Sequence, residues 1–225
     1  PRIAIVEKKD KLREINFFLC PELNKWQLET LDILGISKTK CLSSVHYRHI
    51  ESNNIITTSH PWVRTENIIN EIENLPSWIS NWLKQKFLPF KSNNKFPKKF
   101  FIDRSDSTSN LKDLRYIINE NEVLDFVKSK GFETIKLSEL SFKDELKLFN
   151  DADTVIGLQG AGLTNLIWCN QNTKIIELRS KLTNKLFENL AFQNQINFKK
   201  LEYDPIEKFV ADHYGSIKVD IKELE

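Results

Sequence analysis

The chain has 225 residues, of which 40% are hydrophobic and 28% are charged. Its 33 basic and 31 acidic residues leave a net charge of only +2, which argues against a surface built to bind nucleic acid or an anionic membrane. No apolar run is long enough to span a bilayer, and the three cysteines lack the spacing of a disulfide framework or a zinc site. Because the chain begins at Pro1 and contains no Met, we expect it to be a piece of a longer protein.

The pattern before residue 100 is mixed. The expected elements are a strand over 15–19, a helix over 26–34, a strand over 55–58 and one or two helices over 66–84 that are interrupted at Pro76. Asn24 is expected to cap the first of these helices and Gly35 to end it. The stretch 84–99 is rich in Lys and Asn, and we interpret it as a linker between two α/β halves. A long surface loop inside one domain is the alternative.

After this stretch, strands and helices alternate. The expected strands are 100–102, 134–137, 154–157, 174–178 and 198–203. The first expected helix is opened by a capping box of Asn119 and Glu122 and is ended by Gly131. Three further helices are expected over 142–149, from Thr164 onward and over 184–193. Such alternation predicts a parallel sheet covered on both faces. Parallel sheets bind ligands at the carboxyl ends of their strands.

Residues 155–165 read Val-Ile-Gly-Leu-Gln-Gly-Ala-Gly-Leu-Thr-Asn and are the most informative stretch of the chain. An apolar strand is followed by a turn with two glycines and then by a helical pattern. Glycines let backbone N–H groups approach a ligand closely, and the amino end of a helix favours anions. A tight turn that merely requires small residues is the alternative.

Two arginines are predicted to share the edge of the sheet with this turn. Arg104 directly follows the first strand of the second half, and Arg115 lies a short loop later. A guanidinium group beside a glycine-rich turn can hold two phosphate oxygens at once. The alternative is that the arginines pair with nearby acids, namely Asp103, Asp106 or Glu120.

Two acidic motifs and one histidine complete the candidates. Glu177, near the end of an apolar strand, is suited to accept hydrogen bonds from ribose hydroxyls, or alternatively pairs with Arg179. The sequence 151–153, Asp-Ala-Asp, matches a metal-binding motif of sugar transferases, but it precedes a strand and therefore lies at the opposite edge of the sheet, so no metal site is expected. His60 follows an expected strand and is the candidate general base, with a surface role as the alternative.

The ordered motifs of the second half resemble glycosyltransferase family 61. They are Arg104, the segment 115–122 (Arg-Tyr-Ile-Ile-Asn-Glu-Asn-Glu), the pairs and triplets at 131–132 and 140–142, the segment 149–153, the glycine turn and the segment 175–178 (Ile-Ile-Glu-Leu). In the first half, residues 31–36 are similar to the family as well. The resemblance covers about residues 20–180 of this chain.

The resemblance implies a GT-B-like architecture, with two Rossmann-like α/β domains that have parallel sheets and face a cleft. Residues 1–90 would form a truncated, acceptor-side domain, and residues 98–225 the nucleotide-sugar-binding domain. The implied donor-binding residues are Arg104, Arg115, Asn119, Gln159, Gly160, Ala161, Gly162, Leu163, Thr164, Asn165 and Glu177.

The implied activity is the inverting, metal-independent transfer of a sugar from a nucleotide-sugar, expected to be a UDP-sugar, to a glycan or another hydroxyl acceptor. No cofactor is expected. The expected setting is the biosynthesis of surface or capsular polysaccharide in the cytoplasm or at its membrane, or the Golgi or ER lumen if the source is eukaryotic.

Three departures from the family pattern leave a second class open, a non-catalytic homologue that binds a nucleotide or a glycan. Gln159 stands where the family usually has His, and Tyr116 replaces the second Arg of an arginine pair. An upstream Asn-aromatic-x-His-Trp segment is not found in this chain. We expect the Gln159 side chain to point into the cleft and its amide to donate a hydrogen bond to the diphosphate.

Overall fold

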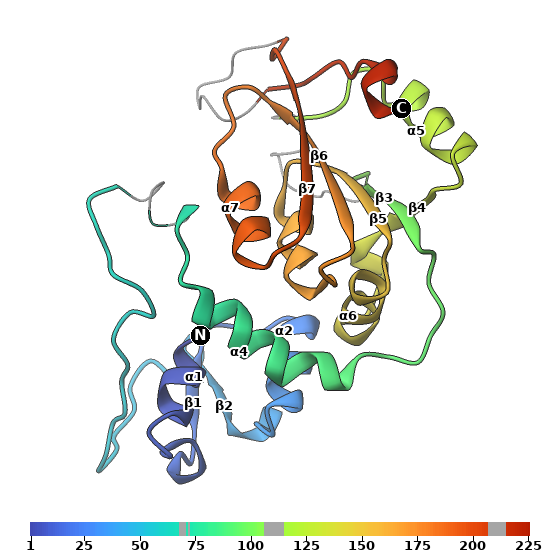
Figure 1. Cartoon of the computed structure of the whole chain (residues 1–225). Helices are drawn as coiled ribbons and strands as arrows, with labels where there is room; N and C mark the ends of the chain where they lie inside the picture. Colours follow the sequence, from blue (N-terminus) through green and yellow to red (C-terminus); the bar gives the residue numbers. More distant parts are fainter. Residues whose placement is uncertain (68–70, 72, 106–114, 207–214) are drawn as a thin grey trace.

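The computed structural model describes residues 1–67, 71, 73–105, 115–206 and 215–225. Its main feature is a five-stranded sheet with the spatial order β4-β3-β5-β6-β7, in which all neighbouring strands are parallel (Figure 1). The strands are β3 (Lys99–Asp103), β4 (Glu133–Lys136), β5 (Thr154–Leu158), β6 (Lys174–Ser180) and β7 (Asn197–Tyr203). The parallel sheet predicted for the second half is therefore present, and each strand begins within one residue of its expected start.

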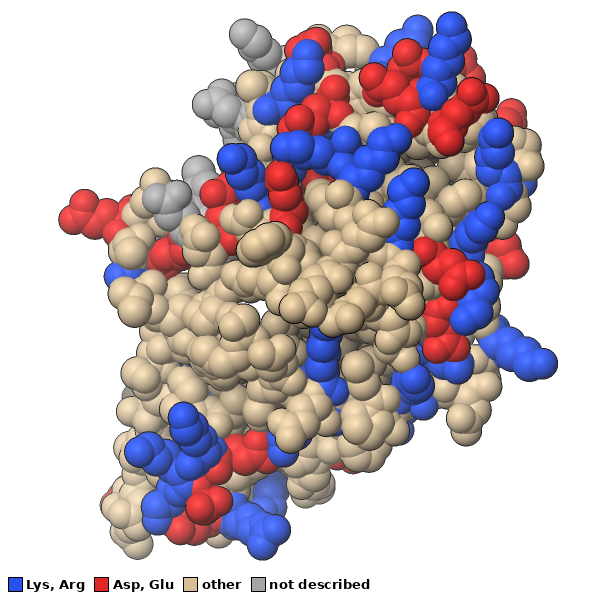
Figure 2. Space-filling view, in the orientation of Figure 1, with Lys and Arg blue, Asp and Glu red and all other residues tan. Residues whose placement is uncertain are grey.

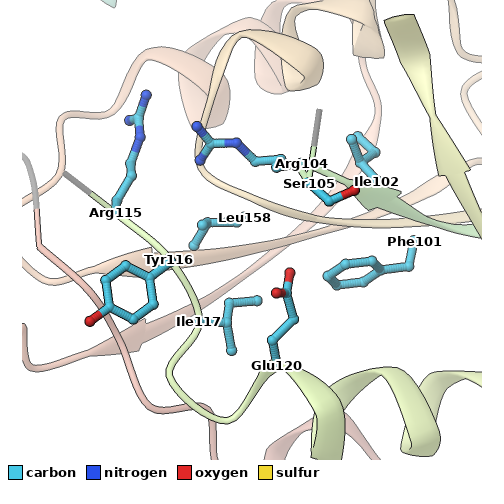
Figure 3. Close-up of a pocket in the computed structure, with 9 residues that line it drawn as sticks. All are labelled: Phe101, Ile102, Arg104, Ser105, Arg115, Tyr116, Ile117, Glu120 and Leu158. Carbon is cyan, nitrogen blue, oxygen red and sulfur yellow. The ribbon is translucent and has the colours of Figure 1, made fainter. Parts of the chain in front are cut away.

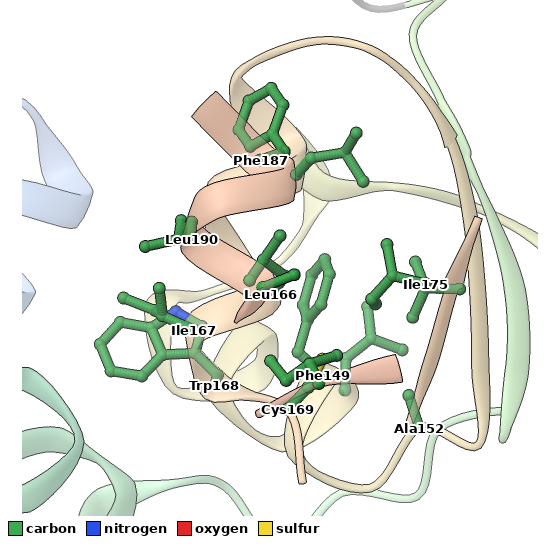
Figure 4. Close-up of a cluster of buried hydrophobic side chains, with 14 of the residues drawn as sticks. Phe149, Ala152, Leu166, Ile167, Trp168, Cys169, Ile175, Phe187 and Leu190 are labelled. Atoms are coloured by element: carbon green, nitrogen blue, oxygen red, sulfur yellow. The ribbon is translucent and has the colours of Figure 1, made fainter. Parts of the chain in front are cut away.

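The sheet is buried on both faces because its central strands are apolar at successive positions. Phe100 and Val155 are fully buried in a core under one face, and Phe101 and Ile156 are buried in a second core under the other face. Figure 4 shows part of the first core. Continuous apolar strands of this kind are typical of a parallel sheet with helices on both sides.

The helices of the second half divide between the two faces. The helix α5 (Glu120–Ser129) lies on one face, while α6 (Phe142–Asn150), the 3-10 helix η6 (Ala161–Trp168) and α7 (Leu186–Gln193) cover the other. As predicted, α5 is followed by Gly131 in the left-handed conformation, at φ +80°. The helix expected from Thr164 instead begins at Ala161, directly at the turn, and is 3-10 rather than α-helical.

The first half contains a parallel pair, β1 (Phe18–Cys20) and β2 (Cys41–Ser43), with α1 (Arg2–Glu7), α2 (Lys25–Ile33) and α4 (Ser77–Phe87). The prediction for α2 is confirmed: Asn24 and Gln27 form a reciprocal capping box, and Gly35 has φ +74°. Residues 68–70 and 72 of the helical region expected before Pro76 lie outside the described residues. The helix after this proline is α4.

The prediction of a strand over 55–58 is wrong. This run has no regular secondary structure, and Ile55 is 78% exposed. An apolar, β-branched run forms a strand only where a neighbouring strand supplies hydrogen bonds and another layer covers its side chains. The strand that pairs with β1 is instead β2, which the sequence pattern did not indicate.

The stretch 84–99 does not behave as a free linker. Its first residues belong to α4, and the ring of Phe87 is buried against Phe142 and Trp168 of the second half, with ring centroids 5.3 and 6.2 Å away. Further along, the Ser92 N–H donates to the Lys143 carbonyl oxygen at 3.1 Å. The segment therefore follows the surface of α6, and the division into domains 1–90 and 98–225 stays a prediction.

The charged side chains show no large field of one sign on the face drawn in Figure 2. Basic and acidic residues are interspersed over the five-stranded half and again over the amino-terminal end, with an uncharged band between them. In the part of the chain that the structure describes, no helix has both the length and the hydrophobicity needed to cross a membrane.

Candidate functional site

The spatial order of the strands creates a crevice between β3 and β5. From β3 the chain first adds β4 on one side, then returns across β3 and adds β5, β6 and β7 on the other side. The connections that leave β3 and β5 therefore pass to opposite faces of the sheet. Doubly wound α/β sheets bind ligands at this switch point, outside the carboxyl ends of the strands.

Gln159 joins the two predicted arginines at this point. Nη1 of Arg104 donates to the main-chain carbonyl oxygen of Gln159 at 3.3 Å, and Nη1 of Arg115 donates to its side-chain oxygen Oε1. Figure 3 shows both guanidinium groups extending to the same side of Leu158. The Gln159 side chain is buried, and its Oε1 accepts from Arg115; the expectation that its amide group donates to a diphosphate stays a prediction.

The glycine turn lies directly against these arginines. A Cβ atom at Gly160 would lie 3.4 Å from Cζ of Arg104, an ordinary contact distance, so the guanidinium lies directly beside the turn. At Gly162 a Cβ atom would lie 3.0 Å from Cδ1 of Leu137, which is tighter than most real Cβ contacts, so a larger residue would require Leu137 to shift by a few tenths of an ångström. The alternative of a turn that favours small residues therefore applies to Gly162, whereas Gly160 contacts the candidate binding group.

A pocket of about 110 Å³ lies beneath the two guanidinium groups (Figure 3). It is lined by Phe101, Ile102, Arg104, Ser105, Arg115, Tyr116, Ile117, Glu120 and Leu158. Apolar walls with a few convergent polar groups are typical of a small-molecule site. The carboxylate of Glu120, which is the first residue of α5, points into this pocket (Figure 3).

The sequence placed Glu120 in the family-like segment 115–122 and offered it as a pairing partner for an arginine, but did not assign it to the donor site. The available signal was its position at the start of a helix directly after Asn119, because such a residue lies at the carboxyl edge of the sheet. Asp106, another predicted partner, lies outside the described residues.

Asn165 and Thr164 contribute no described contact to the pocket. The amide Nδ2 of Asn165 donates to Oε2 of Glu145 at 2.9 Å, and its Oδ1 accepts from Nε1 of Trp168 at 2.9 Å. These bonds direct the side chain toward α6, on the opposite face of the sheet from the pocket. Thr164 is exposed, and Leu163 is buried in the core beneath the turn.

Glu177 lies inside β6, because this strand continues to Ser180, two residues beyond its predicted end. Its side chain is 0% exposed, and Oε2 pairs with Nη1 of Arg179 at 3.2 Å. The same guanidinium also contacts Glu188 and Glu202. The alternative role predicted for Glu177 is thus the observed contact, and a ribose has no access to this carboxylate. Burial raises the pKa of Glu177 to about 7, against the opposing effect of Arg179.

The side chain of Asn119 binds the backbone of Val219, far along the sequence, and does not cap the start of α5. It precedes α5 but makes no side-chain cap bond, so the predicted capping box is wrong. Instead its Nδ2 donates to the Val219 carbonyl oxygen at 2.9 Å, and its Oδ1 accepts from the Val219 N–H at 2.9 Å. Nδ2 also contacts Oε2 of Glu122 at 3.0 Å.

The contacts of His60, the candidate base, are local in the described chain. Its Nδ1 lies 3.1 Å from the Trp62 carbonyl oxygen, and the two rings pack edge to face with centroids 4.3 Å apart. None of the described contacts joins His60 to Arg104, Arg115 or Gln159.

The Asp-Ala-Asp sequence lies at the amino ends of the strands, as predicted. It lines a polar pocket of about 490 Å³ together with Lys98 and residues 170–173. Oδ2 of Asp151 pairs with Nζ of Lys147 at 2.5 Å, and nearby lysines hold the pKa of Asp151 below its ordinary value although burial opposes them. Among the described side chains, no group of three or more His, Cys, Asp or Glu residues is placed to hold a metal ion.

A parallel sheet with a glycine turn and two converging arginines at its switch point is the arrangement of a nucleotide- or phosphate-binding α/β domain. Residues 3–176 match the family model of glycosyltransferase 61, and the chain belongs to this family. The resemblance stated from the sequence is therefore confirmed.

Several curated glycosyltransferases are similar over short regions. The EGF domain-specific O-linked N-acetylglucosamine transferase of Gallus gallus is 29% identical over 91 residues, which are 38% of this chain and 17% of that protein. A beta-1,2-xylosyltransferase of Oryza sativa subsp. japonica is 31% identical over 115 residues, 47% of this chain and 20% of that protein. An alpha-1,3-arabinosyltransferase of the same plant is 27% identical over 109 residues, 44% and 18% of the two chains. The matched region thus spans no more than a fifth of these relatives.

Proposed function

We propose that this chain forms the donor-binding part of an inverting glycosyltransferase of the GT-B type. The donor is a nucleotide-sugar, specifically a UDP-sugar, and the acceptor is a hydroxyl group of a glycan or another molecule. The observation that carries this proposal is the convergence of Arg104 and Arg115 on Gln159, beside the glycine turn and at the carboxyl edge of a parallel sheet. Membership of a glycosyltransferase family supports it independently.

The proposed contribution of this half of the protein to the reaction is to stabilise the negative charge of the leaving group. In an inverting transfer, the acceptor oxygen forms a bond to the anomeric carbon and its hydroxyl loses a proton to a base, while the bond between the anomeric carbon and the phosphate oxygen breaks and its electron pair leaves with the nucleoside diphosphate. The two guanidinium groups and the N–H groups at the start of η6 are suited to stabilise the negative charge of this leaving group. Because fixed positive charges can serve the diphosphate in this way, we propose a metal-independent mechanism.

The pocket beneath the arginines is proposed to receive part of the nucleoside. Its walls are apolar, and the Glu120 carboxylate can accept a hydrogen bond from an N–H or O–H group of a bound ligand. Ribose hydroxyls and the ring N–H of uracil are groups of this kind. The hydroxyl-accepting role that the sequence suggested for Glu177 is thereby proposed for Glu120.

The setting proposed for this activity is the synthesis of a surface or capsular polysaccharide, in the cytoplasm or at its membrane. If the source is eukaryotic, the Golgi or ER lumen is the corresponding compartment. The names of the relatives support sugar transfer in general.

A non-catalytic homologue that binds nucleotide is the second candidate. The contacts of one predicted donor-binding residue and of the candidate base favour it: the Gln159 side chain binds Arg115, and Nδ1 of His60 contacts the Trp62 carbonyl oxygen. Neither contact supplies a base for the acceptor hydroxyl.

The first test is the affinity for UDP, measured by calorimetry on the whole protein that carries this sequence. Replacing Arg104 by Ala removes a charge-assisted contact to phosphate and should raise the Kd about 10- to 100-fold. Arg13→Ala, which removes an exposed arginine far along the chain from the site, is the matched control. An unchanged Kd in Arg104→Ala would show that this residue is not part of the donor site. A separate assay of sugar transfer from UDP-sugars distinguishes the enzyme from the non-catalytic homologue.

A further inference from the structure

The segment that carries Arg115 is paired with the carboxyl-terminal end of the chain. The Ile217 N–H donates to the Tyr116 carbonyl oxygen at 3.0 Å, and the Ile118 N–H donates to the Ile217 carbonyl oxygen at 2.9 Å. Together these bonds form a parallel bridge between Ile117 and Ile217. Arg115 directly precedes Tyr116, whose carbonyl oxygen accepts the first of these two bonds.

Asn119 continues the pairing with its side chain. Its amide makes two hydrogen bonds with the backbone of Val219, one through each polar atom and both 2.9 Å long. An amide that binds both the N–H and the C=O of one residue takes the place of a strand's backbone. The bridge and this amide pair, which we call the C-terminal clamp, therefore attach residues 116–119 to residues 217–219.

The clamp is anchored to the sheet on its apolar side. Ile117, Ile217 and Val219 are all buried in the core that also contains Phe101 and Ile156 of β3 and β5. The side chains that alternate with Ile117, those of Tyr116 and Ile118, are exposed. The clamp thus fixes the backbone at the point from which the Arg115 side chain extends to Gln159.

We propose that the C-terminal clamp positions Arg115 for the donor diphosphate and that Asn119 is a positioning residue, not a donor ligand. This inference rests on the proposed function. An arginine whose backbone is already fixed loses less conformational freedom when it binds a phosphate, so the clamp should increase donor affinity without contacting the donor. The family match ends at residue 176, so residues 217–219 lie outside it.

The test compares Asn119→Ala with Asn194→Ala in the whole protein. Asn194 is a buried asparagine whose Nδ2 also donates to a backbone oxygen, that of Leu190 at 2.7 Å, but it lies at the end of α7, and none of its described hydrogen bonds involves the clamp. Asn119→Asp keeps an acceptor for the Val219 N–H and should restore part of the loss. Each Asn119 variant is also made in an Arg115→Ala background.

Two measurements decide the inference. Hydrogen exchange should become about fivefold faster or more at the Ile118 amide in Asn119→Ala but not in Asn194→Ala, because only the former loosens the clamp. The Kd for UDP should rise about five- to tenfold in Asn119→Ala and should not rise further when Arg115 is already Ala, since residues that act through one another are not additive.

Unchanged exchange at Ile118, or an equal additional loss of UDP affinity in the Arg115→Ala background, would overturn the inference. If Arg115→Ala alone leaves UDP binding unchanged, then the assignment of Arg115 to the donor site is wrong, and the coupling proposed here fails with it. Hydrogen exchange still shows in that case whether the clamp exists, so the two failures can be told apart.

Discussion

Gln159 holds two arginines with two different oxygens, one from the main chain and one from the side chain. The main-chain contact to Arg104 is available to any residue at this position. The contact to Arg115 requires a side chain at position 159 that is long enough to bring a buried acceptor oxygen to Nη1 of Arg115. Substitutions of Gln159 therefore change the surroundings and the position of Arg115 while leaving the main-chain contact to Arg104 in place.

Replacing Gln159 by Glu should weaken the binding of UDP. The new carboxylate would accept from Arg115 as the amide does, but it would place a negative charge beside both guanidinium groups and compete with the diphosphate. We expect the Kd from calorimetry at pH 7.5 to rise about tenfold or more. Gln171→Glu makes the same charge change at the opposite edge of the sheet and should leave the Kd unchanged. Equal losses in both variants would mean that the effect is one of net charge.

The positions of single site residues were only partly predictable from the sequence. Arg104 and the glycine turn follow strands directly, so the ends of the strands determine where they lie. The pairing of Glu177 with Arg179, two residues along the same strand, was one of two alternatives that the sequence offered. Asn119 and Asn165 instead bind partners elsewhere in the chain, namely Val219 and Glu145. A sequence pattern shows that such a side chain needs a partner, but it does not show which partner the fold supplies.

Among the helices, α6 carries a partly buried acid, Glu145, close to a contact between the two halves. Burial raises the pKa of Glu145 to about 7, and the nearby carboxylate of Glu29 adds to the shift, while the hydrogen bond from Asn165 opposes it. Glu29, on α2, accepts the Phe142 N–H at the start of α6 at 2.8 Å. The native state thus binds a proton on Glu145 at pH values where the unfolded chain has released it. The resulting stability is greatest below about pH 4.5 and is lost as the pH rises through about 7.

Glu145→Gln should therefore stabilise the protein at high pH. The amide imitates the protonated acid and can still accept from Asn165, so the variant and the parent should have equal free energies of unfolding near pH 4.5. At pH 8 the variant should be more stable by about 1–3 kcal/mol. Chemical unfolding at the two pH values measures this, with Glu139→Gln, at an exposed position, as the control. A variant that is less stable at pH 8 would show that the carboxylate is charged and favourable in the native state.

At the level of elements, the second half was predictable because its strands are apolar on both faces and are separated by helices with clear ends. The run at 55–58 has the same local composition as a strand, yet the chain offers it no neighbouring strand and no covering layer. The η6 helix was expected to begin three residues later than it does, because the sequence around Gly160 and Gly162 resembles a loop. At Gly162 the turn packs tightly against Leu137, within a helix that already begins at Ala161.

The whole molecule has two chemically different edges along its main sheet. The carboxyl edge carries the arginines and the glycine turn, and the amino edge carries Asp151, Asp153 and Lys98. Only the first edge is built from the connections that diverge at the switch point. The parallel direction of all five strands is what allows the sequence to assign each motif to an edge.

Sugar transfer should not depend on the acids of the amino edge. In the whole protein, excess chelator should leave the turnover of a UDP-sugar unchanged, and Asp151→Asn should change kcat less than about twofold. The same variant loses the ion pair with Lys147, which should lower the free energy of unfolding by no more than about 1 kcal/mol. Turnover that disappears with chelator and returns with manganese would contradict the proposed mechanism.

The burial of Phe87 against Phe142 and Trp168 affects which fragments of this chain are expected to fold on their own. The Lys- and Asn-rich stretch looks like the natural boundary by composition. A fragment that begins there would lack the ring that closes its own core, and it would expose aromatic surface to solvent and to other molecules. We therefore expect a fragment that includes α4 together with the main sheet to be more stable than one that begins at residue 98, which would place the physical boundary upstream of the compositional one.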